Sequence, residues 1–272
     1  MSAGPPPLSN GGNASSERPS NSDACFTASS PPKHQPQTRP DLLFSAQPSA
    51  PNVPTTDSLF YGNSNAAQHS DRNYSMFMNV PGLKIMVPSN AHDMKGMLKA
   101  AVRDDDPVLC FEDSTCWMSK AELPDDPDFL IPLGKGDIKR EGSDVSIIAI
   151  GGAVPLALKA ASDLAAEGIS AEVVDPRSLV PLDKELILRS VRKTGRAITV
   201  DPAHQTCSAG SEIAAIIAER AFDALRGPVL RIATADTHLP FSPAIEKALY
   251  PSPERIVAAA RKLVGIRQPE NA

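Results

Sequence analysis

Residues 144–201 read "DVSIIAIGGAVPLALKAASDLAAEGISAEVVDPRSLVPLDKELILRSVRKTGRAITVD", and this stretch decides the fold. Its residues 145–150 form an apolar, β-branched run that stops at Gly151-Gly152, which predicts a buried strand followed by a tight turn. A helix is expected next, with Pro155 in its first turn and Gly168 at its left-handed cap, because the apolar residues between them recur at helical spacing.

The same alternation repeats towards the end of this stretch. Residues 169–174 predict a second strand, Asp183 and Gly195 mark the start and end of a second helix, and residues 197–200 predict a third strand. Short connections between almost wholly apolar strands are typical of a parallel sheet covered on both faces. We therefore predict an α/β fold whose mostly parallel sheet carries helices on both faces.

A smaller unit of the same kind precedes this stretch. Residues 83–87 predict a strand, Ser89 or Asn90 caps a helix that runs to Val102, and residues 108–111 predict another strand. Two strands are too few to stand alone, so this βαβ unit should dock on its C-terminal neighbour or on another chain, or be part of a larger domain. If that domain is incomplete, a partner or self-association is expected to cover its apolar face, which consists of Leu83, Ile85, Met94, Leu98 and Val108.

The flanking segments complete the predicted organisation. Residues 1–64 are rich in Ser, Pro, Asn and Gly and should be disordered, because they offer too few apolar side chains for a core. Residues 65–115 hold the partial βαβ unit, residues 116–143 an irregular connector packed down by Trp117, residues 144–266 the main domain and residues 267–272 a tail. Within the main domain, a helix from Ser211 to Ala224, a strand over 229–232 and a helix from Ser252 to Val264 are also expected.

The composition excludes several classes of protein. The net charge of −5 gives no general attraction to nucleic acid or to an anionic membrane surface, and no apolar run is long enough to span a bilayer. The 4 cysteines form no CxxC pair, so we expect free thiols in a reducing compartment.

Two features at the carboxyl ends of the predicted strands are candidates for chemistry, because ligands collect there in open parallel sheets. Gly151-Gly152 is either an anion site at a helix N-terminus or a tight turn, and no nucleotide fingerprint accompanies it. His204 lies three residues after Asp201, which indicates either an acid–base pair or a chance proximity. Spacing alone does not decide between these readings.

Longer motifs resemble a known family. They are "AAQHS" at 66–70, "VPGLKIMVPSNAHDMKGMLKAAVRDDDPVLCFE" at 80–112, "VVDPRSLVPLD" at 173–183 and "RIATADTHLPFSP" at 231–243. From about residue 66 to residue 264 the chain resembles the β subunit of the thiamine-diphosphate-dependent 2-oxo acid dehydrogenases. The resemblance implies a transketolase-like C-terminal domain, preceded here by the last part of a pyrimidine-binding domain, as in an N-terminally truncated subunit.

The resemblance also implies site residues. The family's active-site histidine corresponds to His69, and its potassium ion would be held by the carbonyls of Ala101 and Val102 with the carboxylates of Asp104 and Asp106. Unpaired carbonyls at a helix end and acidic side chains are ligands that suit a hard cation. No counterpart is visible for the glutamate that activates the cofactor's aminopyrimidine ring.

The expected function follows from this family. It is oxidative decarboxylation of pyruvate or a related 2-oxo acid with acyl transfer to a lipoyl carrier, using thiamine diphosphate and Mg²⁺ held largely by an α subunit. The expected partners are the α subunit, a second β subunit and the dihydrolipoyl acyltransferase core. A catalytically dead docking module and an acetoin dehydrogenase β subunit remain as alternatives. We expect a bacterial cytoplasmic location, with the mitochondrial matrix as the alternative.

Overall fold

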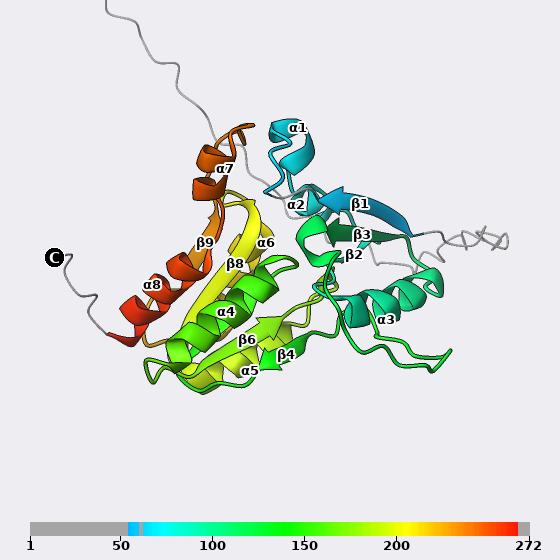
Figure 1. The fold of residues 1–272 in the computed structure, drawn as a ribbon. Helices are drawn as coiled ribbons and strands as arrows, with labels where there is room; N and C mark the ends of the chain where they lie inside the picture. The colour runs from blue at the N-terminus through cyan, green and yellow to red at the C-terminus, as the bar shows by residue number, and fades with distance from the viewer. Residues whose placement is uncertain (1–53, 60–61, 266–272) are drawn as a thin grey trace, which may run out of the picture. The chain divides into compact units, whose positions relative to one another are not determined.

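The computed structural model describes residues 54–59 and 62–265, which all lie in one unit of the chain, residues 48–272 (Figure 1). Two sheets and their covering helices make up this part of the chain. No helix within it is long and apolar enough to cross a membrane. The predicted disorder of residues 1–53 and the predicted tail, residues 267–272, lie outside the described residues.

The larger sheet is the one predicted from residues 144–201. Its strand order is β4-β6-β5-β8-β9, and all pairs are parallel except β4 with β6. The strands are β4 (Asp137–Arg140), β5 (Val145–Ala149), β6 (Ala171–Asp175), β8 (Ala197–His204) and β9 (Leu230–Thr234). Every residue of β5 and β6 is buried, as their apolar sequences predict.

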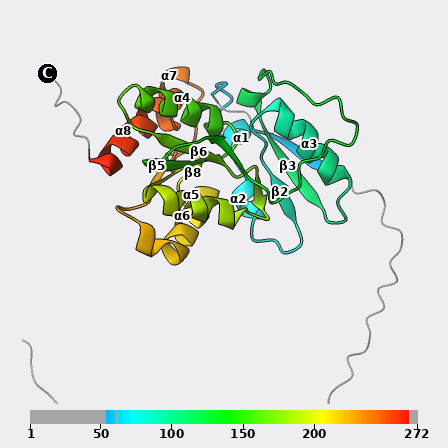
Figure 2. The ribbon, with the colours of Figure 1, turned by 90° about the horizontal axis from the view of Figure 1, so that it is seen from below.

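Helices cover both faces of this sheet, as predicted (Figure 2). Val145, Ile147 and Ala149 of β5 pack towards α4 and α8, whereas Ile148 faces α5 and α6, because successive residues of a strand point to opposite faces. The helices are α4 (Ala153–Ala165), α5 (Lys184–Thr194), α6 (Ala209–Arg220), α7 (Pro243–Leu249) and α8 (Pro253–Val264), with a 3₁₀ turn at Phe222–Ala224.

The smaller sheet has the order β1-β3-β2-β7. Its strands are β1 (Thr55–Leu59), β2 (Lys84–Met86), β3 (Val108–Asp113) and β7 (Ser178–Val180). The first three are parallel, and β7, which comes from the main domain, pairs antiparallel with β2. The βαβ unit therefore docks on its C-terminal neighbour, one of the alternatives that the sequence left open. The helices of this part are α1 (Ala67–Ser70), α2 (Tyr74–Phe77) and α3 (Ala91–Val102), and a 3₁₀ turn spans Ser114–Cys116.

Strand β1 corrects the prediction that residues 1–64 are disordered. Residues Thr55–Leu59 pair in parallel register with Leu109–Asp113 of β3, so that prediction is wrong for this segment. The sequence TTDSL lacks an apolar run, and its pairing depends on the backbone of β3 rather than on its own pattern.

The connector is more ordered than predicted. Asp137–Arg140 adds strand β4 to the edge of the larger sheet, and the Ile131 amide donates a hydrogen bond of 3.1 Å to the carbonyl of Gly96 in α3. Trp117, expected to pack the connector down, is instead 51% exposed.

The connector also covers the apolar face that we expected to be exposed. Ile131 is 7% exposed and packs with Met97 and Val108, and Phe129 and Leu133 of the connector pack against the same cluster, as do Met94 and Leu98. Ile85 is fully buried on the other side of the smaller sheet, in the core shared with the larger sheet. The prediction of an exposed apolar face is therefore wrong, because residues far along the chain supply the cover.

A buried ionic cluster joins α3 to the larger sheet. Asp93 in the first turn of α3 is paired with Lys139 of β4 and with the Arg177 guanidinium, whose Nη2 lies 2.6 Å from its Oδ1. These two cations hold the pKa of Asp93 down to about 2, against the opposing effect of burial. Asp175 accepts a 2.6 Å hydrogen bond from Ser89, and burial raises its pKa to about 6. The residues of "VVDPRSLVPLD" thus join the two sheets.

Candidate functional site

The segment that carries His69 crosses the carboxyl ends of strands from both sheets. His69 lies in α1 and its side chain is exposed. The turn that follows, Asp71 to Asn73, leads directly into α2, and both helices are only four residues long. Helices this short are not stable on their own, so neighbouring side chains must fix the segment.

Arg72 provides the first of these anchors. Its guanidinium lies 3.3 Å from Oδ2 of Asp113 at the end of β3, and both side chains are 1% exposed. The same carboxylate accepts a 3.1 Å hydrogen bond from the amide of Gly152 and bonds from Thr115. A Cβ at position 152 would approach Asp113 Oδ2 to 2.3 Å, so this contact requires glycine. The Gly152 amide thus bonds to a carboxylate of the chain itself, which supports the reading of Gly151-Gly152 as a tight turn.

Tyr74 provides the second anchor. Its hydroxyl donates a hydrogen bond to Oδ1 of Asp201 in β8, and its ring packs edge-on against Phe111, with the centroids 5.7 Å apart. Asp201 also accepts hydrogen bonds from the amides of Ala203 and Gly210, at 2.9 and 2.8 Å. Burial raises the pKa of both the Tyr74 hydroxyl and the Asp201 carboxyl.

Of the two readings of His204 and Asp201, the structure supports chance proximity, because the two side chains have different partners. His204 Nε2 instead lies 3.6 Å from Oδ1 of Asp71, and its Nδ1 is 2.8 Å from the carbonyl oxygen of Ala235. The Asp201 carboxylate is buried and accepts hydrogen bonds from two backbone amides. The spacing of Asp201 and His204 in the sequence does not reveal this orientation.

The Asp71–His204 pair lines a cavity of about 590 Å³ at the carboxyl ends of β8 and β9. Thr206, Asp236, Thr237 and His238 complete its lining. The side chains around it can accept and donate protons, and the His69 segment borders it through Asp71. Sequence reasoning missed Asp71, although its position two residues after His69 was the available signal.

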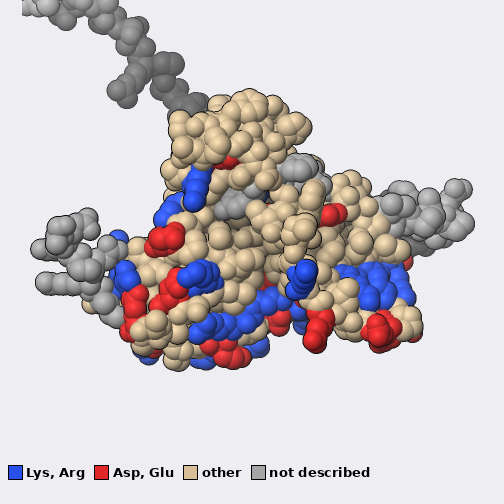
Figure 3. Space-filling view, in the orientation of Figure 1, with Lys and Arg blue, Asp and Glu red and all other residues tan. Residues whose placement is uncertain are grey.

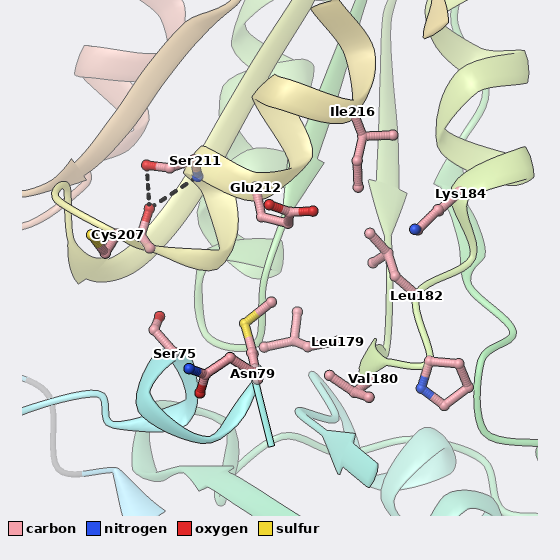
Figure 4. Close-up of a pocket in the computed structure, with 13 residues that line it drawn as sticks. Ser75, Asn79, Leu179, Val180, Leu182, Lys184, Cys207, Ser211, Glu212 and Ile216 are labelled. Carbon is pink, nitrogen blue, oxygen red and sulfur yellow. Dashed lines mark hydrogen bonds between the residues drawn. The ribbon is translucent and has the colours of Figure 1, made fainter. Parts of the chain in front are cut away.

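A larger groove of about 750 Å³ lies between α2, β7 and the start of α6 (Figure 4). Leu179 and Val180 line it from β7, and Glu212 and Ile216 line it from α6. Lys184 adds a positive charge at its edge. None of the predicted site residues lines this mainly apolar groove, which therefore suits contact with another molecule better than proton-transfer chemistry.

Two domain families match the chain. The transketolase pyrimidine binding domain matches residues 44–115 and the transketolase C-terminal domain matches residues 134–256. The acetoin:2,6-dichlorophenolindophenol oxidoreductase subunit beta of Bacillus subtilis strain 168 is 48% identical over 215 residues, which are 78% of this chain and 63% of that protein. The 2-oxoisovalerate dehydrogenase subunit beta of the same organism is 45% identical, over 73% of this chain and 61% of the relative.

This chain therefore carries the two transketolase domains, and the proteins that it resembles are β subunits of oxidoreductases. The pyruvate dehydrogenase E1 component subunit beta of Rhizobium meliloti strain 1021 is also similar, with 39% identity over 72% of this chain and 43% of the relative. Among solved structures, a split-gene transketolase described as an inactive beta4 tetramer matches with a TM-score of 0.62 and 28% identity, over 78% of this chain and 66% of that one. The resemblance and the transketolase-like fold are thus confirmed. The chain spans about three fifths of the length of its two Bacillus subtilis relatives.

The match to the pyrimidine binding domain begins at residue 44, ahead of the predicted boundary at residue 65. Strand β1 lies within this match, which explains why a segment of unremarkable composition pairs with β3. More of this domain is present than the sequence pattern indicated.

The residues predicted to bind potassium lie together at the end of α3, but the Lys84 ammonium group already contacts two of them. Lys84 Nζ lies 2.7 Å from Oδ1 of Asp104 and 3.1 Å from Oδ2 of Asp106. The Asp104 amide donates to the carbonyl of Ala101 at 3.2 Å, and Val102 ends the helix. As arranged, these groups do not fit a potassium ion, which would have to displace Lys84 from the two carboxylates.

The described residues show no ready-made metal site of the kind that would accompany thiamine diphosphate. Within residues 54–59 and 62–265, no cluster of three His, Cys, Asp or Glu residues is arranged to hold a metal ion. The amide of Gly152, at the start of α4, donates to Asp113.

The cysteines contribute no further chemistry among the described residues. Cys110 is buried, and its pKa is raised to about 12, mainly by burial; burial also raises that of Cys116 to about 12. Cys207 is an exposed free thiol, and Cys25 lies outside the described residues.

Proposed function

We propose that this chain is the β-type subunit of a thiamine-diphosphate-dependent dehydrogenase of 2-oxo acids, which decarboxylates its substrate oxidatively and passes the acyl group to a lipoyl carrier. The observation that carries the proposal is the placement of the His69 segment. Two buried anchors hold it across the carboxyl ends of β3 and β8, and Asp71 brings it to the cavity that contains His204. The transketolase domains and the similarity to β subunits of dehydrogenases support the same function.

The cofactor, when bound, supplies the carbanion chemistry of decarboxylation. His69 would donate or accept a proton at the substrate-derived group, a contribution worth about 10²- to 10⁴-fold in rate for a well-placed general acid or base. The Asp71–His204 pair adds a second imidazole at the same edge, with its Nδ1 held by the Ala235 carbonyl. This arrangement directs Nε2 of the ring towards Asp71 in the His69 segment.

The partners are part of the proposal. An α subunit would provide the groups for diphosphate and Mg²⁺ that the described residues lack. Figure 3 shows charged side chains mixed over much of one face, but few of them on the end of the molecule that carries α1 and α7. Phe241 and Ile245 are 65% and 58% exposed there, as expected of a surface that another subunit covers. A second β subunit and the dihydrolipoyl acyltransferase core are the further expected partners.

Acetoin is the second candidate substrate, because one of the most similar relatives, at 48% identity, is an acetoin:2,6-dichlorophenolindophenol oxidoreductase subunit. We place the protein in the bacterial cytoplasm, since bacterial relatives predominate among the most similar proteins, and keep the mitochondrial matrix as the alternative because a plant relative is named mitochondrial. A role in assembly alone is the remaining alternative.

The test is turnover with an artificial electron acceptor. The full-length chain is assayed alone and with its α subunit, on pyruvate, branched 2-oxo acids and acetoin, beside His69→Gln. We expect no turnover by the isolated chain, turnover of one substrate class with the α subunit, and a loss of about 10²-fold or more in His69→Gln. Tight association with the α subunit and no turnover on any substrate would instead identify an assembly module. Robust turnover by the chain alone would refute the division of the site between two subunits.

A further inference from the structure

The turn between α1 and α2 is held by two buried polar contacts. Arg72 and Tyr74, two residues apart, place their polar groups on two different buried carboxylates. Asp113 ends β3 of the smaller sheet and Asp201 lies in β8 of the larger sheet. The turn therefore bridges strands of both sheets.

The Arg72 guanidinium acts on the backbone next to His69. Its Nη1 donates a 3.1 Å hydrogen bond to the carbonyl of Ser70, while its Nη2 reaches Asp113. The Ser70 carbonyl belongs to the residue that follows His69, so this bond fixes the last peptide of α1. A planar guanidinium can hold two acceptors at set directions at the same time, which an ammonium group on a flexible stem cannot.

Both carboxylates are themselves held rigidly. Asp113 accepts hydrogen bonds from Gly152 and Thr115, and Asp201 accepts from Ala203 and Gly210. Through these two carboxylates, Arg72 and Tyr74 fix the turn relative to strands β3 and β8 and to the first residues of helices α4 and α6. A buried ion pair contributes little net stability compared with apolar side chains of similar size, but it does specify one geometry.

The same turn also sets Asp71, whose carboxylate faces His204 across 3.6 Å. Asp71 is exposed, whereas Arg72 beside it is 6% exposed, so the buried neighbour determines where the exposed one points. Without the anchors, a four-residue helix and its turn would sample several arrangements, and Asp71 would lose its placement opposite His204.

We propose that Arg72 and Tyr74 are positioning residues, which fix the segment that carries His69 and hold Asp71 at the His204 cavity through Asp113 and Asp201. This inference rests on the proposed function of His69 in proton transfer. Tyr74 and Arg72 touch no reacting group themselves, and they act by limiting the motion of the α1–α2 turn.

The decisive experiment is a double-mutant cycle in the complex with the α subunit. Tyr74→Phe removes one hydroxyl and keeps the ring packed on Phe111, and His69→Gln removes the proton-transfer group. We expect Tyr74→Phe to lower kcat by about 10- to 100-fold, with KM changed less than about twofold, because displacements near 1 Å have effects of this size. In the His69→Gln background, the same substitution should lower kcat by less than about twofold, because Tyr74 acts through His69.

Ser190→Ala is the matched control. It removes a buried hydroxyl that lies 2.6 Å from Ser146 Oγ at the amino end of β5, away from the site, and kcat should stay within about twofold of wild type. Arg72→Lys keeps the charge but should lower kcat as Tyr74→Phe does. A lysine ammonium cannot bond the Ser70 carbonyl and the Asp113 carboxylate in the fixed directions of the guanidinium. An equal loss in both histidine backgrounds would mean a general structural effect and would overturn the inference.

A second readout does not depend on activity. Hydrogen exchange measured by mass spectrometry on the full-length chain should show faster exchange of residues 62–73 in Tyr74→Phe and in Arg72→Lys, but not in Ser190→Ala. If His69→Gln keeps full kcat, the proposed role of His69 in proton transfer is refuted. If kcat falls in His69→Gln but not in Tyr74→Phe, only the positioning role of Tyr74 is refuted. Unchanged exchange in both anchor variants would refute the inference whatever the kinetics show.

Discussion

Replacing Asp175 with asparagine should change how the stability of this protein depends on pH. Asp175 is fully buried; its Oδ2 accepts from Ser89 Oγ at 2.6 Å and its Oδ1 accepts from the Arg177 amide at 2.9 Å. Lys139 Nζ is 3.8 Å away, and the second carboxylate of the cluster, Asp93, lies nearby on α3 and is paired with Lys139 and Arg177. Desolvation outweighs these contacts and raises the pKa of Asp175 from 3.8 to about 6.

The sign of the effect follows from proton binding. Because the folded state holds the Asp175 proton more tightly than the unfolded state, deprotonation destabilises the fold as pH rises from about 4 to about 6. A shift of about 2 pKa units corresponds to about 3 kcal/mol in the free energy of unfolding. This penalty is absent below the unfolded pKa and fully developed above the folded one.

Asp175→Asn removes the titration and one acceptor oxygen. We expect the variant to be less stable than wild type at pH 4, because an acceptor for Ser89 or for the Arg177 amide is lost. The stability of the variant relative to wild type should then improve by about 3 kcal/mol between pH 4 and pH 7.5.

Urea unfolding, followed by circular dichroism at a series of pH values, measures this difference. Ser190→Ala loses a buried hydroxyl contact without changing any acid, so its difference from wild type should not vary with pH. A pH-independent difference between wild type and Asp175→Asn would refute the argument that burial outweighs Lys139 and Arg177 at this carboxyl.

Two further predictions concern contacts that the sequence did not reveal. Lys84→Met removes the ammonium from Asp104 and Asp106, so the melting temperature of the variant should rise more with K⁺ than with Li⁺ at equal ionic strength, while wild type shows no such preference. Thermal denaturation measures the melting temperatures of the variant and of wild type in each salt. A K⁺ preference in wild type would mean that Lys84 does not occupy the predicted potassium site. Ile131→Ala should lower the free energy of unfolding by about 2–4 kcal/mol in urea titrations, since Ile131 covers Met97 in a buried cluster. A loss no larger than that of the exposed Leu123→Ala would contradict the role of the connector as the cover of α3.

The sequence by itself determined the helices and strands that are marked by local signals, such as an apolar run, an N-cap residue or a glycine at a helix end. The apolar run 145–150 became β5, because almost every side chain along it gains from burial on one face or the other. Asn90 caps α3 through its bond to the Asp93 amide, and Asp183 and Gly195 delimit α5 as predicted, with Gly195 at φ 70°. Such signals are local, so they can be read without knowledge of the rest of the chain.

Only the tertiary structure decided the edge strands and the partners of the site residues. Strands β1, β4 and β7 are three to five residues long and exist because a neighbouring strand offers unpaired backbone groups, which their own sequences do not record. Asp201 is three residues from His204 but bonds Tyr74, 127 positions away, whereas His204 faces Asp71. A side chain's partner depends on which way its strand presents it and on what the fold brings opposite. His69 could therefore be inferred as a candidate site residue from a motif, but the contacts of Arg72 and Tyr74 that place its segment could not.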